Sequence, residues 1–313
     1  MQAGEVPESS IVLRPFYWSD LEEYTSLVNE VQGLVEQPRA FSASYMAERL
    51  AQPGRQPEDN CFLEEGDESL TGYALVLPEL VIGRVVVEGG VLPSHRRQGV
   101  GSRLLEAALK RAQALEAGVV HIAAPGDNPK SHRFLEHRGF SLVRRYWGML
   151  WQNGEVPELE TPPGFSLRSF ASGDEGLLTR VQNSAFGDSW GFCPNTVEEI
   201  SYRVRMSRCN PEGILFLIRD GGVAAYCWTL IEGDGEHRAG VVGMAGVSPP
   251  YRGLGLSRVA LLAGMRYLRS QGVEAIDLTV DSENLLATRT YLALGFRRVS
   301  ETLWYEGRLG SAR

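Results

Sequence analysis

The sequence predicts an α/β protein of two tandem domains, each with a mixed, mostly antiparallel β-sheet flanked by helices. Three observations lead to this fold class. The chain has 313 residues, about twice a typical domain length of roughly 150 residues. Its composition, 43% hydrophobic and 22% charged, is typical of a globular protein that builds a real core. Finally, a set of motifs occurs twice at a nearly constant interval.

The repeat is clearest in a glycine-rich segment. VLPSHRRQGVG at 91–101 reappears as VSPPYRGLGLS at 247–257, an interval of 156 residues (247 − 91 = 156). Asn128 and Asn284 keep this interval, and so do the Gly-Phe pairs at 139–140 and 295–296. LRPF at 13–16 matches LRSF at 167–170. Landmarks that hold register over most of each half indicate a tandem duplication.

The segment between the copies predicts a linker. QNGEVPELETPPGF at 152–165 is rich in Pro, Gly and acidic residues and has no apolar period. We therefore expect domains at residues 1–151 and 164–313, joined by a linker at 152–163.

Each half is expected to contain the same elements in the same order. A strand at LRxF precedes two helical stretches, the first at 20–35 and 173–185, and the strands of the second half include 214–219 and 224–231, which are rich in β-branched and aromatic residues. A strand ending at Val-x-Pro, the glycine-rich turn, a helix (101–117 and 257–271) and a strand (119–123 and 275–280) follow. A helix after the Asn and a last strand after Gly-Phe complete each half. Strands and helices in this order imply a mixed sheet flanked by helices.

Charge and composition exclude several classes of partner. Lys and Arg number 31 against 39 for Asp and Glu, a net charge of −8 that disfavours binding to nucleic acid. The acidic, polar N-terminus and the lack of a run of about 18 apolar residues argue against export or a membrane span. Four cysteines without CxxC spacing fit a reducing cytoplasm, and the histidines show no metal-like grouping. We expect a cytoplasmic protein without a metal.

The two glycine-rich turns are candidate anion sites. A strand that ends at such a turn and opens into a helix leaves several N–H groups unpaired and pointing one way, with the positive end of the helix dipole behind them. Arg96 and Arg252 can add charge at the rim. The turns lack the Lys-Ser/Thr of a P-loop and the third glycine of a dinucleotide fold. A lone glycine-rich turn is also typical of an ordinary strand-to-helix connection, so the motifs around it must decide whether it binds an anion.

Arg-x-x-Gly-x-Gly/Ala after a Val-x-Pro strand end, followed by an Asn-initiated helix and Gly-Phe, resembles the acetyl-CoA-binding core of the GNAT acyltransferase superfamily. The resemblance covers nearly the whole chain, twice. It implies that the turn amides hold the pyrophosphate of coenzyme A, and that the strand before each turn splays from its neighbour around the pantetheine arm. The implied cofactor-binding residues are Val91, Arg96, Arg97, Gln98, Gly99, Val100, Gly101, Ser102 and Asn128 in the first copy, and Val247, Arg252, Gly253, Leu254, Gly255, Leu256, Ser257 and Asn284 in the second.

Two features qualify this assignment. The second turn departs from the family pattern at Ser257, where Gly or Ala is usual. Asn128 and Asn284 each precede a helix, so an N-cap role is their default, with or without a contact to the pantetheine arm.

The same resemblance makes Tyr291 the general acid that protonates the coenzyme A sulfur. The corresponding position of the first copy is Leu135 (291 − 156 = 135), which cannot donate a proton. Catalysis is therefore expected in the second copy, with the first as a cofactor-binding or structural relic. A tyrosine that only packs its ring in the core is the alternative.

The general base is harder to predict. An amine nucleophile must lose its proton, so a carboxylate, a histidine or a water chain is expected near the fourth strand. Glu236 and His237 precede that strand in the second copy, although both also suit a solvated hairpin. In the first copy Glu88 lies on the corresponding strand, and if Glu88 is a base the first domain is active after all.

The acceptor is expected at the connection between the first two helices of the second half. Asp188, Trp190 and Phe192 in SAFGDSWGFCPN could bind a cationic amine by charge and cation–π contacts. A packed aromatic loop with Asp188 as a helix cap is equally compatible with this segment.

These expectations combine into one function and one rival. The first is an acetyl-CoA-dependent N-acetyltransferase that acts on the primary amine of a small molecule by direct attack, as a monomer or, alternatively, a dimer. The rival is a non-catalytic protein that binds or senses acyl-CoA, with one or both domains degenerate.

Overall fold

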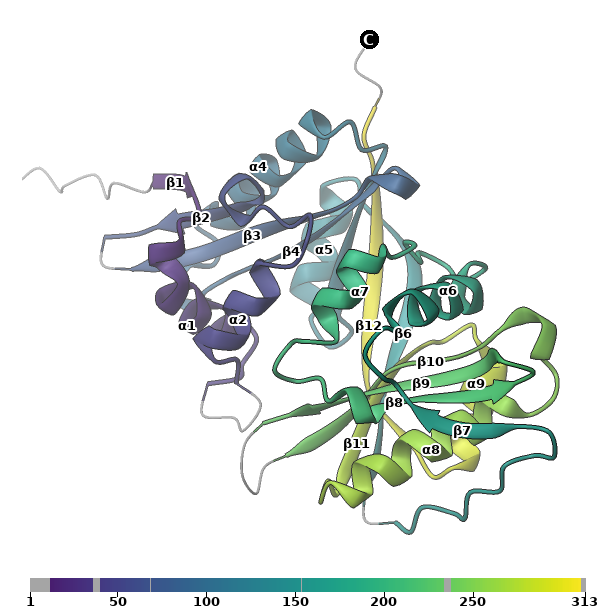
Figure 1. Ribbon diagram of the computed structural model, residues 1–313. Coiled ribbons are helices and arrows are strands. Elements are labelled where there is room, and N and C mark those ends of the chain that lie inside the picture. The colour runs from purple at the N-terminus through teal and green to yellow at the C-terminus, as the bar shows by residue number, and fades with distance from the viewer. Residues whose placement is uncertain (1–11, 36–39, 68, 153, 234–237, 311–313) are drawn as a thin grey trace, which may run out of the picture. The chain divides into compact units, whose positions relative to one another are not determined.

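The computed structural model describes residues 12–35, 40–67, 69–152, 154–233 and 238–310 (Figure 1). The first copy contains β1 (Val12–Pro15), α1 (Leu21–Val31), α2 (Ala43–Leu50), α3 (Pro57–Asn60), β2 (Cys61–Glu65), β3 (Leu70–Glu79), β4 (Arg84–Val91), α4 (Val100–Ala114), β5 (Val119–Pro125), α5 (Pro129–His137) and β6 (Ser141–Gln152). The second contains β7 (Ser166–Ser169), α6 (Glu175–Phe186), α7 (Val197–Arg203), β8 (Ile214–Arg219), β9 (Gly222–Glu232), β10 (Ala239–Val247), α8 (Leu256–Ser270), β11 (Ala275–Asp281), α9 (Leu285–Ala293) and β12 (Arg297–Arg308).

The predicted order of elements is confirmed in both copies. The helix expected at 257–271 is α8, and the strand expected at 214–219 is β8 with the same bounds. The short helix α3 is an addition that the sequence patterns did not predict. The sheet is mixed and mostly antiparallel. β4 pairs with β5 and β10 with β11 in parallel, whereas the pairs β1–β2, β2–β3, β3–β4, β6–β11, β7–β8, β8–β9 and β9–β10 are antiparallel. The predicted fold class is therefore confirmed.

Packing divides the chain into two compact units, Met1–Ile122 with Glu306–Arg313, and Ala123–Tyr305. In the first unit the strands follow the order β1-β2-β3-β4-β5. In the second the order is β12-β6-β11-β10-β9-β8-β7. The unit boundaries differ from those of the repeats because β6, the last strand of the first copy, pairs from Tyr146 to Gln152 with β11 of the second. The domain bounds predicted from the sequence repeat, 1–151 and 164–313, therefore stay a prediction.

The second unit buries apolar side chains on both faces of its sheet. Helix α8 packs against β8, β9 and β10 on one face, where Leu217, Cys227 and Met265 belong to one buried cluster. Helices α6 and α7 cover the other face, where Phe216 and Tyr226 belong to a second cluster (Figure 1). Alternate residues of β8 and β9 thus enter opposite cores, as the period of two in a strand requires.

The duplication extends to individual hydrogen bonds. Arg14 holds Asp20 in the first copy, and Arg168 holds Asp174 at the same place in the second. The Asn29 side chain both accepts from and donates to the Phe41 backbone, at 2.8 and 2.9 Å. Asn183 does the same to Asn195, at 2.9 Å each. These paired contacts fix the helix-to-helix connection in the same way in each copy.

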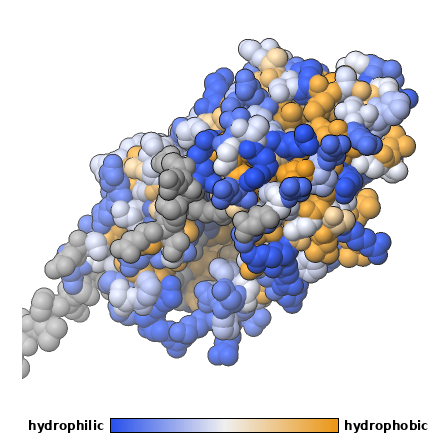
Figure 2. Space-filling model, turned by 90° about the horizontal axis from the view of Figure 1, so that it is seen from below, coloured by the Kyte–Doolittle hydropathy of each residue, from blue (hydrophilic) through white to orange (hydrophobic). Residues whose placement is uncertain are grey.

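The surface mixes polar and apolar residues, and the face in Figure 2 shows hydrophobic groups set among hydrophilic ones. In the described parts of the chain, no helix combines the length and hydropathy that a membrane span needs. The same residues contain no group of three or more His, Cys, Asp or Glu side chains placed to hold a metal ion.

Candidate active site

The two glycine-rich turns each lead directly into a long helix. Gly99 precedes α4 with φ +83°, and Gly255 precedes α8 with φ +74°. Both are the N-cap residues of their helices, and no side chain caps either helix by a hydrogen bond. The third amide of each helix donates to its own N-cap carbonyl, Ser102 to Gly99 and Arg258 to Gly255, so the amides of the first two helical residues are the ones that can meet an anion. At Gly255, no described atom lies within 4 Å of where a Cβ would stand, so the approach to the backbone is open.

The strand before the second turn separates from its neighbour as the family resemblance predicts. The pairing of β10 with β11 runs from Gly240↔Ile276 to Val242↔Leu278 and then ends, although β10 continues to Val247 and β11 to Asp281. At the same point the ladder of β10 with β9 shifts register between Val242 and Met244. The intervening Gly243 is a bulge residue, which bends the strand and redirects its backbone groups.

The Asn residues at the start of α5 and α9 are N-caps. The Asn128 side chain accepts from the Ser131 amide at 3.2 Å, and the Asn284 side chain accepts from the Ala287 amide at 3.1 Å. Their default structural role is thus observed. Any contact of these side chains with a cofactor stays a prediction.

Tyr291 lies on α9 and packs against the core cluster beneath α8. Its ring centroid is 5.9 Å from that of Phe296. Burial, with a smaller contribution from Cys227, raises the pKa of Tyr291 to about 12. The phenol therefore remains protonated at neutral pH, as a proton donor must, and is a weaker acid than a phenol in water. Leu135 is buried at 4% exposure in the corresponding helix α5.

The first turn differs from the second in the cationic groups around its backbone. Arg97 adopts φ +67°, where the second copy has Gly253 at φ +82°. Arg103 Nη1 donates to the Gln98 carbonyl at 3.3 Å and would lie 2.9 Å from a Cβ at Gly99. Arg103 is also paired with Glu64, a carboxylate with no exposed surface. A guanidinium thus lies against the first turn, an arrangement that the sequence patterns did not reveal.

Asp188, a predicted acceptor residue, is paired with a predicted cofactor residue. Arg252 Nη1 donates to Asp188 Oδ2 at 2.7 Å, and Arg252 Nη2 donates to the Ala185 carbonyl at 3.1 Å. Both side chains of the ion pair are exposed, at 44% and 79%, so it is weak. The contact connects the loop at 187–196 to the second turn.

The two predicted aromatic residues of this loop have different surroundings. The Phe192 ring is 5.7 Å from Phe186, which fits a packing role. Trp190 lies 6.2 Å from the ring of Tyr146 and 6.0 Å from that of Trp304. Tyr146 and Trp304 belong to β6 and β12, and their proximity depends on strand order, which no local sequence pattern carries.

Of the three candidate general bases, only Glu88 lies in the part of the chain that the structure describes. Glu236 and His237 lie outside the described residues. All nine residues of β10 are described, and AGVVGMAGV contains no titratable side chain. In the first copy, the Glu88 carboxylate forms an ion pair with Arg49.

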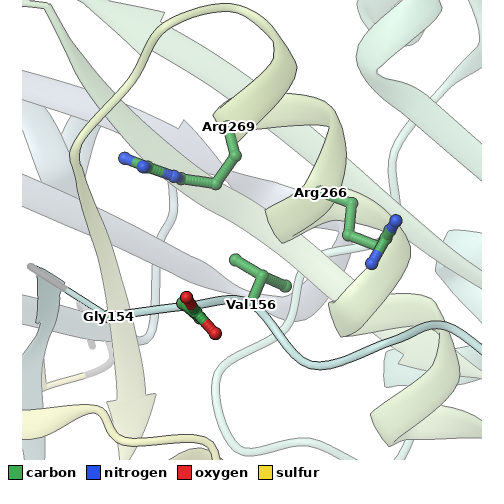
Figure 3. Close-up of a pocket in the computed structure, with 5 residues that line it drawn as sticks. Gly154, Val156, Arg266 and Arg269 are labelled. Carbon is green, nitrogen blue, oxygen red and sulfur yellow. The ribbon is translucent and has the colours of Figure 1, made fainter.

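A separate surface pocket lies near the linker. It is lined by Gly154, Glu155, Val156, Arg266 and Arg269, and Figure 3 shows the two arginines extending from α8 toward the linker. Arg266 donates to the Pro157 carbonyl at 3.3 Å, and the Arg269 guanidinium lies 5.8 Å from the Trp151 ring. Arg266 is ten residues beyond the start of α8, roughly 15 Å along the helix. This pocket is distinct from the predicted site and reflects linker packing.

Comparison with known proteins identifies the family of both copies. The model of the acetyltransferase (GNAT) family matches residues 18–140 and 178–296. The mycothiol acetyltransferase of Stackebrandtia nassauensis is 34% identical over 259 residues, which cover 81% of this chain and 84% of that protein. That of Saccharopolyspora erythraea is 33% identical over 242 residues, 73% of this chain and 79% of that protein.

Solved structures of similar proteins have the same architecture. A GCN5-related N-acetyltransferase from Sphaerobacter thermophilus has a TM-score of 0.74 at 25% identity and covers 95% of both chains. A tandem GNAT protein of the clavulanic acid biosynthesis pathway has a TM-score of 0.73 at 17% identity, over 97% of this chain and 100% of its own, and shows the fold alone. The chain therefore belongs to the GNAT family of acetyltransferases, which use acetyl-CoA as the acetyl donor.

Proposed function

We propose that the second copy transfers the acetyl group of acetyl-CoA to the primary amine of a small molecule by direct attack, with Tyr291 as general acid. The observation that carries this proposal is a convergence within one copy. Parallel pairing ends before the turn in both copies, after Val87 in β4 and after Val242 in β10, but only the second copy combines it with an open turn at Gly255 and the phenol of Tyr291. The first copy has Leu135 in place of the phenol.

The residues of the second copy fit acetyl-CoA. The unfilled space at Gly253 and Gly255 and the uncapped start of α8 suit a pyrophosphate, with Arg252 beside it for charge. From Gly243 to Val247, β10 no longer pairs with β11, although Met244 to Val247 still pair with β9, so the side of β10 that faces β11 offers backbone groups to a pantetheine amide. Arg252 would exchange its contact with the exposed carboxylate of Asp188 for a phosphate, which costs little because surface ion pairs are weak.

Acetyl-CoA supplies a thioester, whose carbonyl carbon an unprotonated amine attacks. The backbone N–H groups of Ala245 to Val247 would stabilise the charge that develops on the carbonyl oxygen. The Tyr291 Oη holds a proton at neutral pH because burial raises its pKa to about 12. That proton would go to the departing sulfur as the C–S bond breaks.

A small-molecule acceptor is supported by the relatives, which carry the name mycothiol acetyltransferase. We extend from these proteins only the acceptor class, a small molecule with a primary amine. Because β10 has no titratable side chain, the base must come from another segment or from a water chain. Glu236 and His237 keep their place as candidates.

The substitution Tyr291→Phe tests the proposal. It should lower kcat about 100-fold and leave the Kd of acetyl-CoA unchanged, because only the proton donor is lost. The measurement is release of free thiol from acetyl-CoA with a panel of primary amines. Tyr267→Phe is the matched control, since the Tyr267 hydroxyl in the same core has no hydrogen-bond partner among the described residues. Turnover by Tyr291→Phe at the parent rate would contradict the general-acid role.

One observation favours the rival function, an acyl-CoA-binding protein without turnover. It is the lack of a titratable group on β10. This alternative predicts that acetyl-CoA binds with ordinary affinity and that no amine in the panel accelerates thiol release above the rate in buffer.

A further inference from the structure

We propose that Trp151, on the last strand of the first copy, is a positioning residue for the reaction of the second copy: it holds the end of α9 and thereby the phenol of Tyr291. The proposal rests on the proposed function and adds to it a residue that the other copy contributes. Trp151 was not a candidate from the sequence. Its role is indicated by the pairing of its strand, by its contact with Gly295 and by the lack of such a contact in the first copy.

Strand β6 belongs to the first copy by sequence and to the sheet of the second copy by pairing. It runs antiparallel to β11, with Trp151 opposite Ile276 and Met149 opposite Leu278. Trp151 and Met149 are buried, at 3% and 1% exposure, in the cluster that contains Met265 of α8. Because residues two apart on a strand share a face, β6 presents both side chains to this core.

The indole of Trp151 contacts the turn that follows α9. A Cβ built at Gly295 would lie 3.5 Å from Trp151 Cδ1 and 3.6 Å from Trp151 Nε1, which are van der Waals distances. Arg269, in the last turn of α8, has its guanidinium 5.8 Å from the centre of the Trp151 ring. The indole therefore touches both the end of α8 and the turn after α9.

The turn at Gly295 is joined directly to the proton donor. The Tyr291 carbonyl accepts hydrogen bonds from the amides of Leu294 and Phe296, each at 3.1 Å, and Gly295 lies between these two donors in the chain. The rings of Tyr291 and Phe296 are 5.9 Å apart. A displacement of this turn therefore moves the backbone that carries the phenol. An error of about 1 Å in the place of a catalytic group can cost about 100-fold in rate.

The first copy lacks this contact and also lacks the phenol. Gly139 corresponds to Gly295 (295 − 156 = 139), and no described atom lies within 4 Å of a Cβ built at Gly139. Leu135 takes the place of the tyrosine in that copy. The residue of β12 that corresponds to Trp151 is Gly307 (151 + 156 = 307), which has no side chain to pack. The indole contact and the phenol thus occur together, as expected if one supports the other.

A double-substitution cycle separates positioning of Tyr291 from simple packing. In the full chain, Trp151→Leu should lower kcat for amine-dependent thiol release about tenfold and leave the KM of acetyl-CoA unchanged, because only the place of the phenol is altered. In the Tyr291→Phe background the same change should alter kcat less than about twofold, since the hydroxyl through which it acts is gone. Met149→Ala is the matched control, because it removes buried volume from the same face of β6 and should leave kcat at the parent value.

Trp151→Phe provides a second measurement, because Trp151→Leu removes much buried volume. It keeps an aromatic ring in the core and should lower kcat about threefold in the parent and not in the Tyr291→Phe background. Thermal unfolding identifies the variants that are folded at the assay temperature. Where Trp151→Leu does not fold, the cycle with Trp151→Phe decides.

The outcomes separate this inference from the proposed function. Equal fractional losses of kcat in the parent and Tyr291→Phe backgrounds would overturn the positioning role and leave the general acid in place. So would a parent kcat in Trp151→Leu, or a loss in Met149→Ala as large as that in Trp151→Leu. Turnover by Tyr291→Phe at the parent rate would contradict the proposed function, and the inference with it.

Discussion

The two copies of the repeat share their framework and differ at the positions where chemistry is expected. The ion pairs Arg14–Asp20 and Arg168–Asp174 occupy the same place, and Gly99 and Gly255 have the same left-handed backbone. The bulge at Gly243, by contrast, has no equivalent in the β3–β4 ladder, which is continuous from Arg84 to Val91. Contacts that define the fold have thus been kept in both copies, while the groups around each turn have diverged.

The divergence is largest at the helix after each turn. Arg103 in the first copy pairs with the buried carboxylate of Glu64, and the corresponding residue of the second copy is Val259 (103 + 156 = 259). In the first copy the Arg103–Glu64 ion pair thus stabilises the structure beside the turn. In the second copy the same position is apolar and the turn is open. This difference predicts that the two turns respond unequally to substitution.

The largest effect on stability is expected for Arg103→Ala. It leaves the fully buried Glu64 carboxylate without its cation, and because Arg103 itself is 38% exposed the cost should be about 2 kcal/mol, below that of a fully buried pair. Urea denaturation measures the loss, with Val259→Ala as the matched control at below about 1.5 kcal/mol. A double variant, Glu64→Leu with Arg103→Met, should recover most of the stability. Equal losses for Arg103→Ala and Val259→Ala would show that the ion pair is not structural.

A smaller effect is expected from exchanging the residues at the left-handed position of the turns. Arg97→Gly should stabilise the protein by about 1 kcal/mol, because a non-glycine residue with φ +67° is strained. Gly253→Arg, at φ +82°, should destabilise it by a similar amount. Thermal unfolding of the two variants measures both changes. Destabilisation by Arg97→Gly would mean that the Arg97 side chain makes a contact worth more than the strain.

The smallest effect concerns pH and the shared ion pairs. A hydrogen bond from Arg168 holds the pKa of Asp174 below its usual range. A carboxylate with a lowered folded pKa contributes stability above its unfolded pKa of about 4, and this is lost as the pH falls through the folded value. Arg168→Met should therefore cost about 0.5 kcal/mol at pH 7 and almost nothing at pH 2, by urea denaturation. Arg14→Met, its counterpart, should behave alike, and an equal loss at both pH values would contradict the electrostatic origin.

Much of the fold could be predicted because its signals are local or repeated. The apolar spacing in α4 and the β-branched residues of β8 define these elements without any tertiary information. A glycine within a strand is a local sign of a bulge, but β10 contains three glycines, and only the pairing with β9 identifies Gly243 as the bulge residue.

The rest depends on residues distant in sequence. The pairing of β6 with β11 joins residues of different copies, and the repeats alone gave no sign of it. The contact between Arg252 and Asp188 joins residues 64 positions apart. It pairs with Arg252 a carboxylate that we expected, from the sequence, to bind the amine. Tyr146, Trp190 and Trp304 meet for the same reason, so only Trp190 of the three could be singled out from the sequence.

The central claim is that the second copy performs acetyl transfer, and calorimetric titration with acetyl-CoA tests it most directly. Gly255→Val places a β-branched residue at φ +74° and should abolish binding to the second turn together with amine-dependent thiol release. Gly99→Val, at φ +83°, should leave turnover at the parent rate. Loss of turnover in Gly99→Val alone would contradict the account and assign the reaction to the first copy, with Glu88 as its candidate base.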